Sequence, residues 1–285
     1  MEPKILLNLH CHLAEGPLWD QQNQILWWVN IMAGELHRTN PANNSHKTYN
    51  IGRSLGTVGL RQSGGLILAT ADGFATFDPN TETLTFLTDP EANKPENRFN
   101  DGKPAPNGSF FAGTMALNQT AQAGSLYRLN PNHTVDHLVP NITISNGLAW
   151  TQDQKTMYYI DSPSYTVYAF DYDNQTGQIT NQRIAFTVPE EIGAPDGMTI
   201  DTEDMLWIAH YGGSAVHRWH PQTGKILETI QLPTPNITCC TFGGPNLDTL
   251  YITTAGGDTH PNTPAGALFH VKTPYTGLPP FTYKG

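Results

Sequence analysis

The sequence has few charged residues and no long apolar segment. Charged residues are 14% of the 285 positions, against roughly 25% in an average soluble protein. The helix-favouring residues Glu, Lys and Arg are therefore scarce, so long amphipathic helices and coiled coils are not expected. The longest run of aromatic and aliphatic residues, 25–29, is far too short to cross a bilayer.

Cysteine is also rare. The three cysteines, Cys11, Cys239 and Cys240, are too few and too odd in number for the disulfide framework of a small secreted protein. We interpret Cys239 and Cys240 as reduced core residues. The short apolar run at residues 5–7 lacks the basic segment and the long apolar segment of a signal peptide. We therefore expect a soluble, cytoplasmic protein.

Basic residues are outnumbered by acidic ones. The chain has 15 Lys and Arg against 25 Asp and Glu, a formal net charge of −10. A nucleic acid would be repelled, and no cluster of basic residues offsets this locally. The balance suits small neutral or cationic ligands and hard metal ions. We expect a small molecule as the partner, with no nucleic acid and no membrane, while protein partners are not indicated.

Turn-forming residues are abundant, with 26 glycines and 22 prolines. They punctuate short alternating strands in a repeated unit, whose copies begin near Gly16, Gly59, Asn100, Gly147, Gly197 and Gly243. The spacing of about 41 to 50 residues is typical of four-stranded propeller blades. The sequence predicts an all-β, six-bladed propeller that fills residues 1–285 as one domain. Residues 4–9 are expected to complete the last blade and close the ring.

Four of the predicted blades begin with an oxygen-bearing side chain that stands directly before a glycine or one residue further from it. These side chains are Glu15, Asn100, Asn146 and Asp196. Equivalent positions of different blades converge on the central channel, so two carboxylates and two amides would meet there. An all-oxygen set of this kind suits Ca²⁺, Mg²⁺ or Mn²⁺. The alternative is that they are ordinary turn residues, since Asn and Asp favour turns before glycine.

A set of short phrases in fixed order resembles the gluconolactonase/regucalcin family of six-bladed propellers, also called the senescence marker protein family. The phrases span about residues 11–270: Glu15-Gly16-Pro17-Leu18-Trp19, Arg98-Phe99-Asn100-Asp101-Gly102-Lys103, Phe111-Ala112-Gly113-Thr114-Met115, Gly124-Ser125-Leu126-Tyr127, Ile144-Ser145-Asn146-Gly147-Leu148, Tyr159-Ile160-Asp161-Ser162, Pro195-Asp196-Gly197-Met198 and Cys239-Cys240-Thr241-Phe242-Gly243-Gly244. Each phrase is weak alone, and the ordered set is specific.

The resemblance implies that Glu15, Asn146 and Asp196 hold one divalent ion in the channel. Ca²⁺ is the first expectation, with Mg²⁺, Mn²⁺, Zn²⁺ and Fe²⁺ left open. It also implies that Arg98 and Asn100 bind the substrate and that Asp196 doubles as the catalytic acid and base.

Two positions depart from the family pattern. Animal members have a Glu after the Gly-Thr-Met phrase, where this chain places Asn118. The family commonly has an Asp at the position of Ala105. Asn118 is therefore the third expected substrate-binding residue, and the sugar that fits is left open.

The expected function is a metal-dependent lactonase that hydrolyses sugar aldono-lactones, such as gluconolactone, to aldonic acids. No Gly-x-Ser-x-Gly phrase supports an α/β-hydrolase route. Three alternatives stay open: a calcium-binding regulatory propeller with little turnover, a related metal-dependent esterase or phosphotriesterase, and a protein-binding scaffold. His210, at the end of an expected inner strand, could reach the channel mouth. The sequence does not indicate the physiological lactone, the cellular metal or the oligomeric state.

Overall fold

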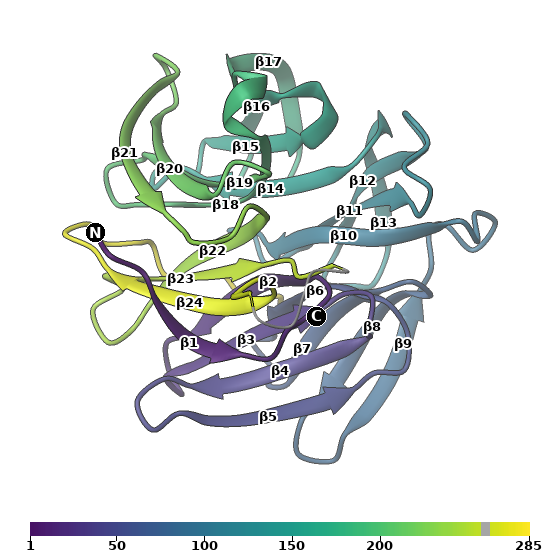
Figure 1. Cartoon of the computed structure of the whole chain (residues 1–285). Helices are drawn as coiled ribbons and strands as arrows, with labels where there is room; N and C mark the ends of the chain where they lie inside the picture. Colours follow the sequence, from purple (N-terminus) through teal and green to yellow (C-terminus); the bar gives the residue numbers. More distant parts are fainter. Residues whose placement is uncertain (258–262) are drawn as a thin grey trace.

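The computed structural model describes residues 1–257 and 263–285, and it consists almost wholly of β-strands. The strands form six antiparallel sheets of four strands each (Figure 1). Two short 3₁₀ turns lie in connections between strands: η1 (Ser162–Ser164) precedes β16 (Thr166–Tyr172), and η2 (Glu190–Ile192) precedes β18 (Ala194–Ile200). No helix in the described ranges is long and apolar enough to cross a membrane. The predicted six-bladed propeller is confirmed.

Each blade runs from an inner strand beside the channel to an outer strand at the rim. The first three blades are β2 (Ala14–Asp20), β3 (Ile25–Asn30), β4 (Glu35–Asn40), β5 (Ser45–Asn50); β6 (Leu55–Leu60), β7 (Leu66–Thr70), β8 (Gly73–Asp78), β9 (Thr83–Thr88); and β10 (Asn97–Pro104), β11 (Phe110–Ala116), β12 (Gly124–Leu129), β13 (Val135–Ile142). The next two are β14 (Ser145–Trp150), β15 (Thr156–Asp161), β16 (Thr166–Tyr172), β17 (Ile179–Thr187); and β18 (Ala194–Ile200), β19 (Leu206–Tyr211), β20 (Ala215–His220), β21 (Lys225–Gln231).

The last blade joins the two ends of the chain. It contains β22 (Ile237–Gly243), β23 (Thr249–Thr254), β24 (Ala267–Lys272) and, outermost, β1 (Lys4–Asn8). Strand β1 pairs antiparallel with β24, with Ile5 opposite Phe269. The N-terminal strand therefore closes the ring, as the sequence predicts.

The apolar core lies between the blades. It divides into six clusters, and each cluster is shared by two neighbouring sheets. In one of them Leu18 and Trp27 of the first blade pack with Val58 and Leu68 of the second. A single twisted sheet buries its two faces only against its neighbours, so the ring is stable as a whole.

Two of the six predicted blade starts are displaced. Gly59 lies inside β6, which begins at Leu55, and Gly243 ends β22, which begins at Ile237. These two blades carry no acidic or amide residue before a glycine at the start of the inner strand. The sequence pattern therefore locates the start only in the other four blades.

A C-terminal strap, defined here as residues 277–283, crosses one end of the channel. Its first residue donates from the Gly277 amide to Leu247 O (2.8 Å), and its last donates from the Tyr283 amide to Leu60 O (2.8 Å). Gly277 also bridges Asp201, directly after β18. Both anchors follow the ends of inner strands, so the strap lies at the channel end opposite to the strand starts.

Candidate functional site

Every inner strand has a β-bulge close to its start. One extra residue is inserted relative to the neighbouring strand between Glu15 and Leu18, Leu55 and Thr57, Phe99 and Gly102, Asn146 and Leu148, Pro195 and Met198, and Ile237 and Cys239. Bulges re-aim side chains and are common next to active sites. Here they recur at one depth of the channel and carry the polar residues that the sequence singles out.

Glycine at the bulge lets neighbouring inner strands approach closely. A Cβ on Gly147 would lie 2.8 Å from Asp196 O, and one on Gly197 would collide with the Cys239 side chain. Only glycine fits such approaches without displacing backbone. The Asn-Gly and Asp-Gly phrases thus bring the backbone at Gly147 close to that of Asp196 across two blades. Asn146 and Asp196 lie within β14 and β18 and not in turns between strands.

A hydrogen-bond chain joins the polar residues of three blades. Arg98 Nη1 donates to Asn100 Oδ1 (2.7 Å), and Asn100 Nδ2 donates to Asn146 Oδ1 (3.2 Å) and Ser145 O (2.8 Å). Asn146 Nδ2 donates to Ser162 Oγ (2.8 Å), which donates to Pro195 O (2.6 Å), next to Asp196. The chain fixes both amide planes and leaves each amide oxygen a second lone pair.

Arg98 is the cation of this site. Burial lowers the pKa of its guanidinium to about 10, against the opposing charges of Glu15 and Asp196. It therefore stays charged at neutral pH. Within the described ranges nothing accepts a hydrogen bond from its buried Nε. An arginine donor buried without a partner can bind an oxygen of a ligand.

Three buried carboxyl groups share the same region: Glu15, Asp101 and Asp196. Burial, followed by the charge of Asp101, raises the pKa of Glu15 to about 8. Burial, followed by the charges of Glu15 and Asp101, raises the pKa of Asp196 well above its usual range. At each of the three carboxylates the amide of the following glycine donates a hydrogen bond. This bond lowers the pKa, but it offsets only part of the increase caused by burial. The site therefore holds excess negative charge that a cation would relieve.

The residues present fit a hard divalent cation. Among the described side chains no group of three or more His, Cys, Asp or Glu is arranged to hold a metal. A site in this region would combine the carboxylates of Glu15 and Asp196 with the amide oxygen of Asn146. Mutually repelling carboxylates and an amide oxygen held in place by Ser162 are typical donors for Ca²⁺ or Mg²⁺.

Three residues of this region were not expected from the sequence. Asp101 has the same Asp-Gly dipeptide as Asp196, so repetition of that dipeptide was a usable signal. Tyr211 is 43% exposed at the end of β19, where it pairs with Ala194 at the start of β18; burial and then the charge of Asp196 raise its pKa. Ser162 stands in one of the family phrases, but the phrase gives it no role, because that role depends on the contact between two blades.

Asn118 lies apart from the cluster. It follows β11, in the connection at the end where the inner strands begin, and its side chain is exposed. Its Oδ1 accepts hydrogen bonds from the Thr120 amide (3.1 Å) and hydroxyl (2.7 Å). The side chain caps its own turn, and its role toward a substrate stays a prediction.

His210 does not reach the mouth, contrary to the suggestion of the sequence. It is fully buried, with Nδ1 3.3 Å from Gly193 O and its ring stacked on Trp219. Burial, and then the neighbouring His217, lower its pKa to about 3. The ring therefore stays neutral and packs within its blade. Cys239 and Cys240 are free and fully buried, which agrees with their interpretation as reduced core residues.

Comparison with known proteins identifies relatives over nearly the whole chain. The family described as the SMP-30/Gluconolactonase/LRE-like region matches residues 13–256. Regucalcin from Oryctolagus cuniculus is 40% identical over 288 residues, which cover 97% of this chain and 96% of that protein.

Two solved structures share the architecture. A luciferin-regenerating enzyme is 30% identical with a TM-score of 0.94, covering 99% of both chains. Regucalcin from Agrobacterium tumefaciens strain C58, described as a calcium-binding protein, is 27% identical with a TM-score of 0.93, covering 99% of this chain and 97% of its own.

Proposed function

The chain belongs to the SMP-30/gluconolactonase/LRE-like family, and on this premise we propose that it is a divalent-metal-dependent lactonase that hydrolyses sugar aldono-lactones to aldonic acids. The observation that supports the proposal is the convergence of Arg98, Asn100, Asn146, Glu15 and Asp196 at one depth of the channel. We further propose that the whole chain acts as one propeller domain, since its first strand completes its last blade.

We assign the metal to Glu15, Asn146 and Asp196. When bound, the cation would supply Lewis-acid stabilisation of the oxyanion that develops in the transition state. Ca²⁺ is our first choice because the donors are all oxygen. The experiment below also tests Mg²⁺, Mn²⁺, Zn²⁺ and Fe²⁺.

Asp196 would move the proton. A lactone opens when water adds to the carbonyl carbon and the bond to the ring oxygen breaks. The Asp196 carboxylate would accept a proton from the attacking water and return it to the departing ring oxygen. No side-chain nucleophile is needed, so the acid product forms directly.

Arg98 and Asn100 would orient the substrate. The unpartnered Nε of Arg98 can donate to a lactone oxygen, and its charge adds to the field at the developing oxyanion. Asn100 holds that guanidinium through Oδ1 and links it to Asn146. A site that only stored calcium would not need a buried arginine beside its ligands.

A calcium-binding regulatory propeller is the second candidate, because the relatives of this chain are named regucalcin and one is described as calcium-binding. The two candidates share the metal and differ in turnover. Hydrolysis of a panel of pentono- and hexonolactones by metal-stripped protein, followed in a pH-stat with each divalent ion added back, separates them. An aryl ester and a phosphotriester in the same panel test the related esterase chemistry.

Metal-restored turnover of at least one lactone, lost in Asp196→Asn, supports the lactonase. Tight Ca²⁺ binding without turnover of any panel member would replace it with the regulatory function.

A further inference from the structure

A cavity lies at the end of the channel opposite to the strand starts. It has a volume of about 80 Å³ and lies beneath the C-terminal strap. Its walls come from the inner strands, mostly beyond the bulges, and from the strap itself; Gly16 and Asp101 lie within the bulges of their strands. The walls are mainly apolar, with Leu18, Val58, Leu148, Trp150, Ile200 and Leu278 among them. The residues assigned above to metal or substrate do not line it, but Asp101, which belongs to the same group of buried carboxyls as Glu15 and Asp196, does.

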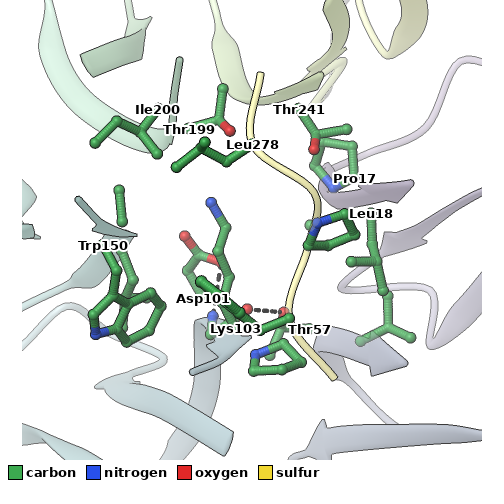
Figure 2. Close-up of a pocket in the computed structure, with 18 of the residues that line it drawn as sticks. Pro17, Leu18, Thr57, Asp101, Lys103, Trp150, Thr199, Ile200, Thr241 and Leu278 are labelled. Carbon is green, nitrogen blue, oxygen red and sulfur yellow. Dashed lines mark hydrogen bonds between the residues drawn. The ribbon is translucent and has the colours of Figure 1, made fainter. Parts of the chain in front are cut away.

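Two charged side chains of β10 face this apolar space. Figure 2 shows Asp101 and Lys103 in the middle of the lining residues, with Trp150 on one side and Leu18 on the other. Asp101 is only 2% exposed. Its Oδ1 accepts from the Gly102 amide (2.7 Å), while within the described chain Oδ2 has no hydrogen-bond partner. A buried oxygen without a partner is destabilising, so it marks a place for a donor.

Lys103 supplies the complementary group. Its ammonium donates to Met198 O, which leaves further donors of its three N–H groups available. No ion pair between Lys103 and a carboxylate occurs among the described residues. Beside the hydroxyl groups of Thr57, Thr199 and Thr241, the cavity thus presents the unpaired acceptor of Asp101 and the donors of Lys103 within a mainly apolar wall.

The strap that covers the cavity is held at its two ends. Between the hydrogen bonds of Gly277 and Tyr283, no backbone hydrogen bond ties residues 278–282 to the blades in the described chain. Pro279 and Pro280 have no amide hydrogen to donate. Side-chain packing alone, such as Phe281 edge-on to Trp150, holds this stretch over the cavity.

We propose that this cavity is a second ligand site, which binds a small neutral alcohol with an apolar chain. A hydroxyl group both donates and accepts, so one group can satisfy Asp101 Oδ2 and a donor of Lys103 together. A carboxylate would be repelled by Asp101, and an ammonium would be repelled by Lys103. The volume is about half that of an apolar cavity of about 150 Å³ that binds benzene, which limits the chain to three or four carbons.

The test uses two isomers of equal size. Butan-1-ol can donate a hydrogen bond, whereas methyl propyl ether cannot. Each is titrated into ¹⁵N-labelled protein, and amide chemical shifts are followed. We expect saturable shifts at Gly102, Lys103 and Trp150 with a millimolar dissociation constant for the alcohol. The ether should bind at least about fivefold more weakly, because it leaves Asp101 Oδ2 unpaired.

A matched pair of variants locates the binding. Leu278→Trp fills the cavity from the strap and should abolish the saturable shifts. Leu227→Trp makes the same change on the exposed outer strand β21 and should preserve them. Equal binding of alcohol and ether, shifts that do not saturate, or binding that survives Leu278→Trp would overturn the site. The readout requires no turnover, so it stands independently of the lactonase proposal.

Discussion

Two buried aspartates of one blade are held in opposite ways. Asp201, directly after β18, accepts four hydrogen bonds: from the amides of Glu203 (2.9 Å) and Met205 (3.0 Å), from Trp207 Nε1 (2.9 Å) and from Arg218 Nε (2.7 Å). Asp196, near the start of the same strand, receives the amide of Gly197 and faces two other carboxyl groups.

The two arrangements suit different roles: Asp201 stabilises the fold, whereas Asp196 is available to a ligand. At Asp201 every lone pair of the carboxylate accepts a hydrogen bond, and the buried guanidinium of Arg218 balances its charge. This ion pair holds the end of β18 against β20. At Asp196 the protein keeps a carboxylate in a poorly compensated place, with burial and like charge raising its pKa. A ligand can relieve the second arrangement and cannot improve the first.

The largest effect is expected for Asp196→Asn. The variant keeps an oxygen for the metal and nearly the same shape, but it cannot accept a proton. At saturating metal, kcat/KM for a lactone should fall by roughly 10²–10⁴-fold. Stability should not fall, because a buried charge is removed. Steady-state kinetics across pH, with urea unfolding in parallel, measure both quantities.

The acidic limb of the pH profile provides the control. In the wild type that limb should report deprotonation of Asp196, and it should be absent from the variant. Near-wild-type turnover at saturating metal with the limb preserved would show that Asp196 is only a ligand.

For Arg218→Met we expect the reverse of the Asp196→Asn result, namely a loss of stability without a loss of turnover. The change leaves Asp201 buried without its cation and removes the guanidinium that lies 4.0 Å from the Tyr275 ring. The free energy of unfolding should fall by about 3 kcal/mol, as when one partner of a buried ion pair is removed. Turnover per folded molecule should be unchanged. The double variant Asp201→Asn/Arg218→Met should lose less than the sum of the two single variants; additivity would contradict the coupling.

The stability of metal-stripped protein should depend on pH through Glu15. Its pKa is about 8 in the folded protein, above the roughly 4.3 of an unfolded chain. A raised folded pKa contributes stability that is complete below pH 4 and is lost as pH rises through 8. Stability should therefore decline across pH 5–8, by on the order of 1 kcal/mol per pH unit.

Thermal unfolding with and without Ca²⁺ measures this decline. Bound cation should remove most of it, since metal binding displaces the proton, and Glu15→Gln should flatten the curve of the stripped protein. A stripped wild type that gains stability between pH 5 and 8 would contradict the raised pKa of Glu15.

The repeat made the fold predictable, and its polar phrases made part of the site predictable. Asn146 and Asp196 stand beside glycines that the close approach of inner strands requires, so a local pattern reports a tertiary contact, whereas Gly16 beside Glu15 is favoured by its positive φ of 51°. The same reasoning misplaced the starts of β6 and β22, where no such phrase exists.

Contacts between distant segments left no local pattern. Ser162 orients Asn146 of its own blade and donates to Pro195 O of the next blade, and the strap covers a cavity built from all six inner strands. His210 shows the opposite error. Its place at the end of a strand predicted a position near the mouth, but its ring is buried and packs against Trp219.

The smallest effect is expected at Asn118, outside both buried clusters. Its exposed side chain can touch only the part of a substrate that projects from the mouth, where solvent weakens each interaction. Asn118→Glu should therefore change relative kcat/KM among lactones by only a few-fold, about 1 kcal/mol or less. Metal affinity should stay unchanged, because neither Glu15 nor Asp196 contacts this turn in the described structure. Asn118→Asp is the matched control, since it adds the charge and keeps the acceptor for Thr120. Competition between pairs of lactones measures the ratio directly. Identical ratios for wild type and both variants would remove Asn118 from the substrate path, whereas a change in metal affinity would show that the mouth and the buried cluster are coupled.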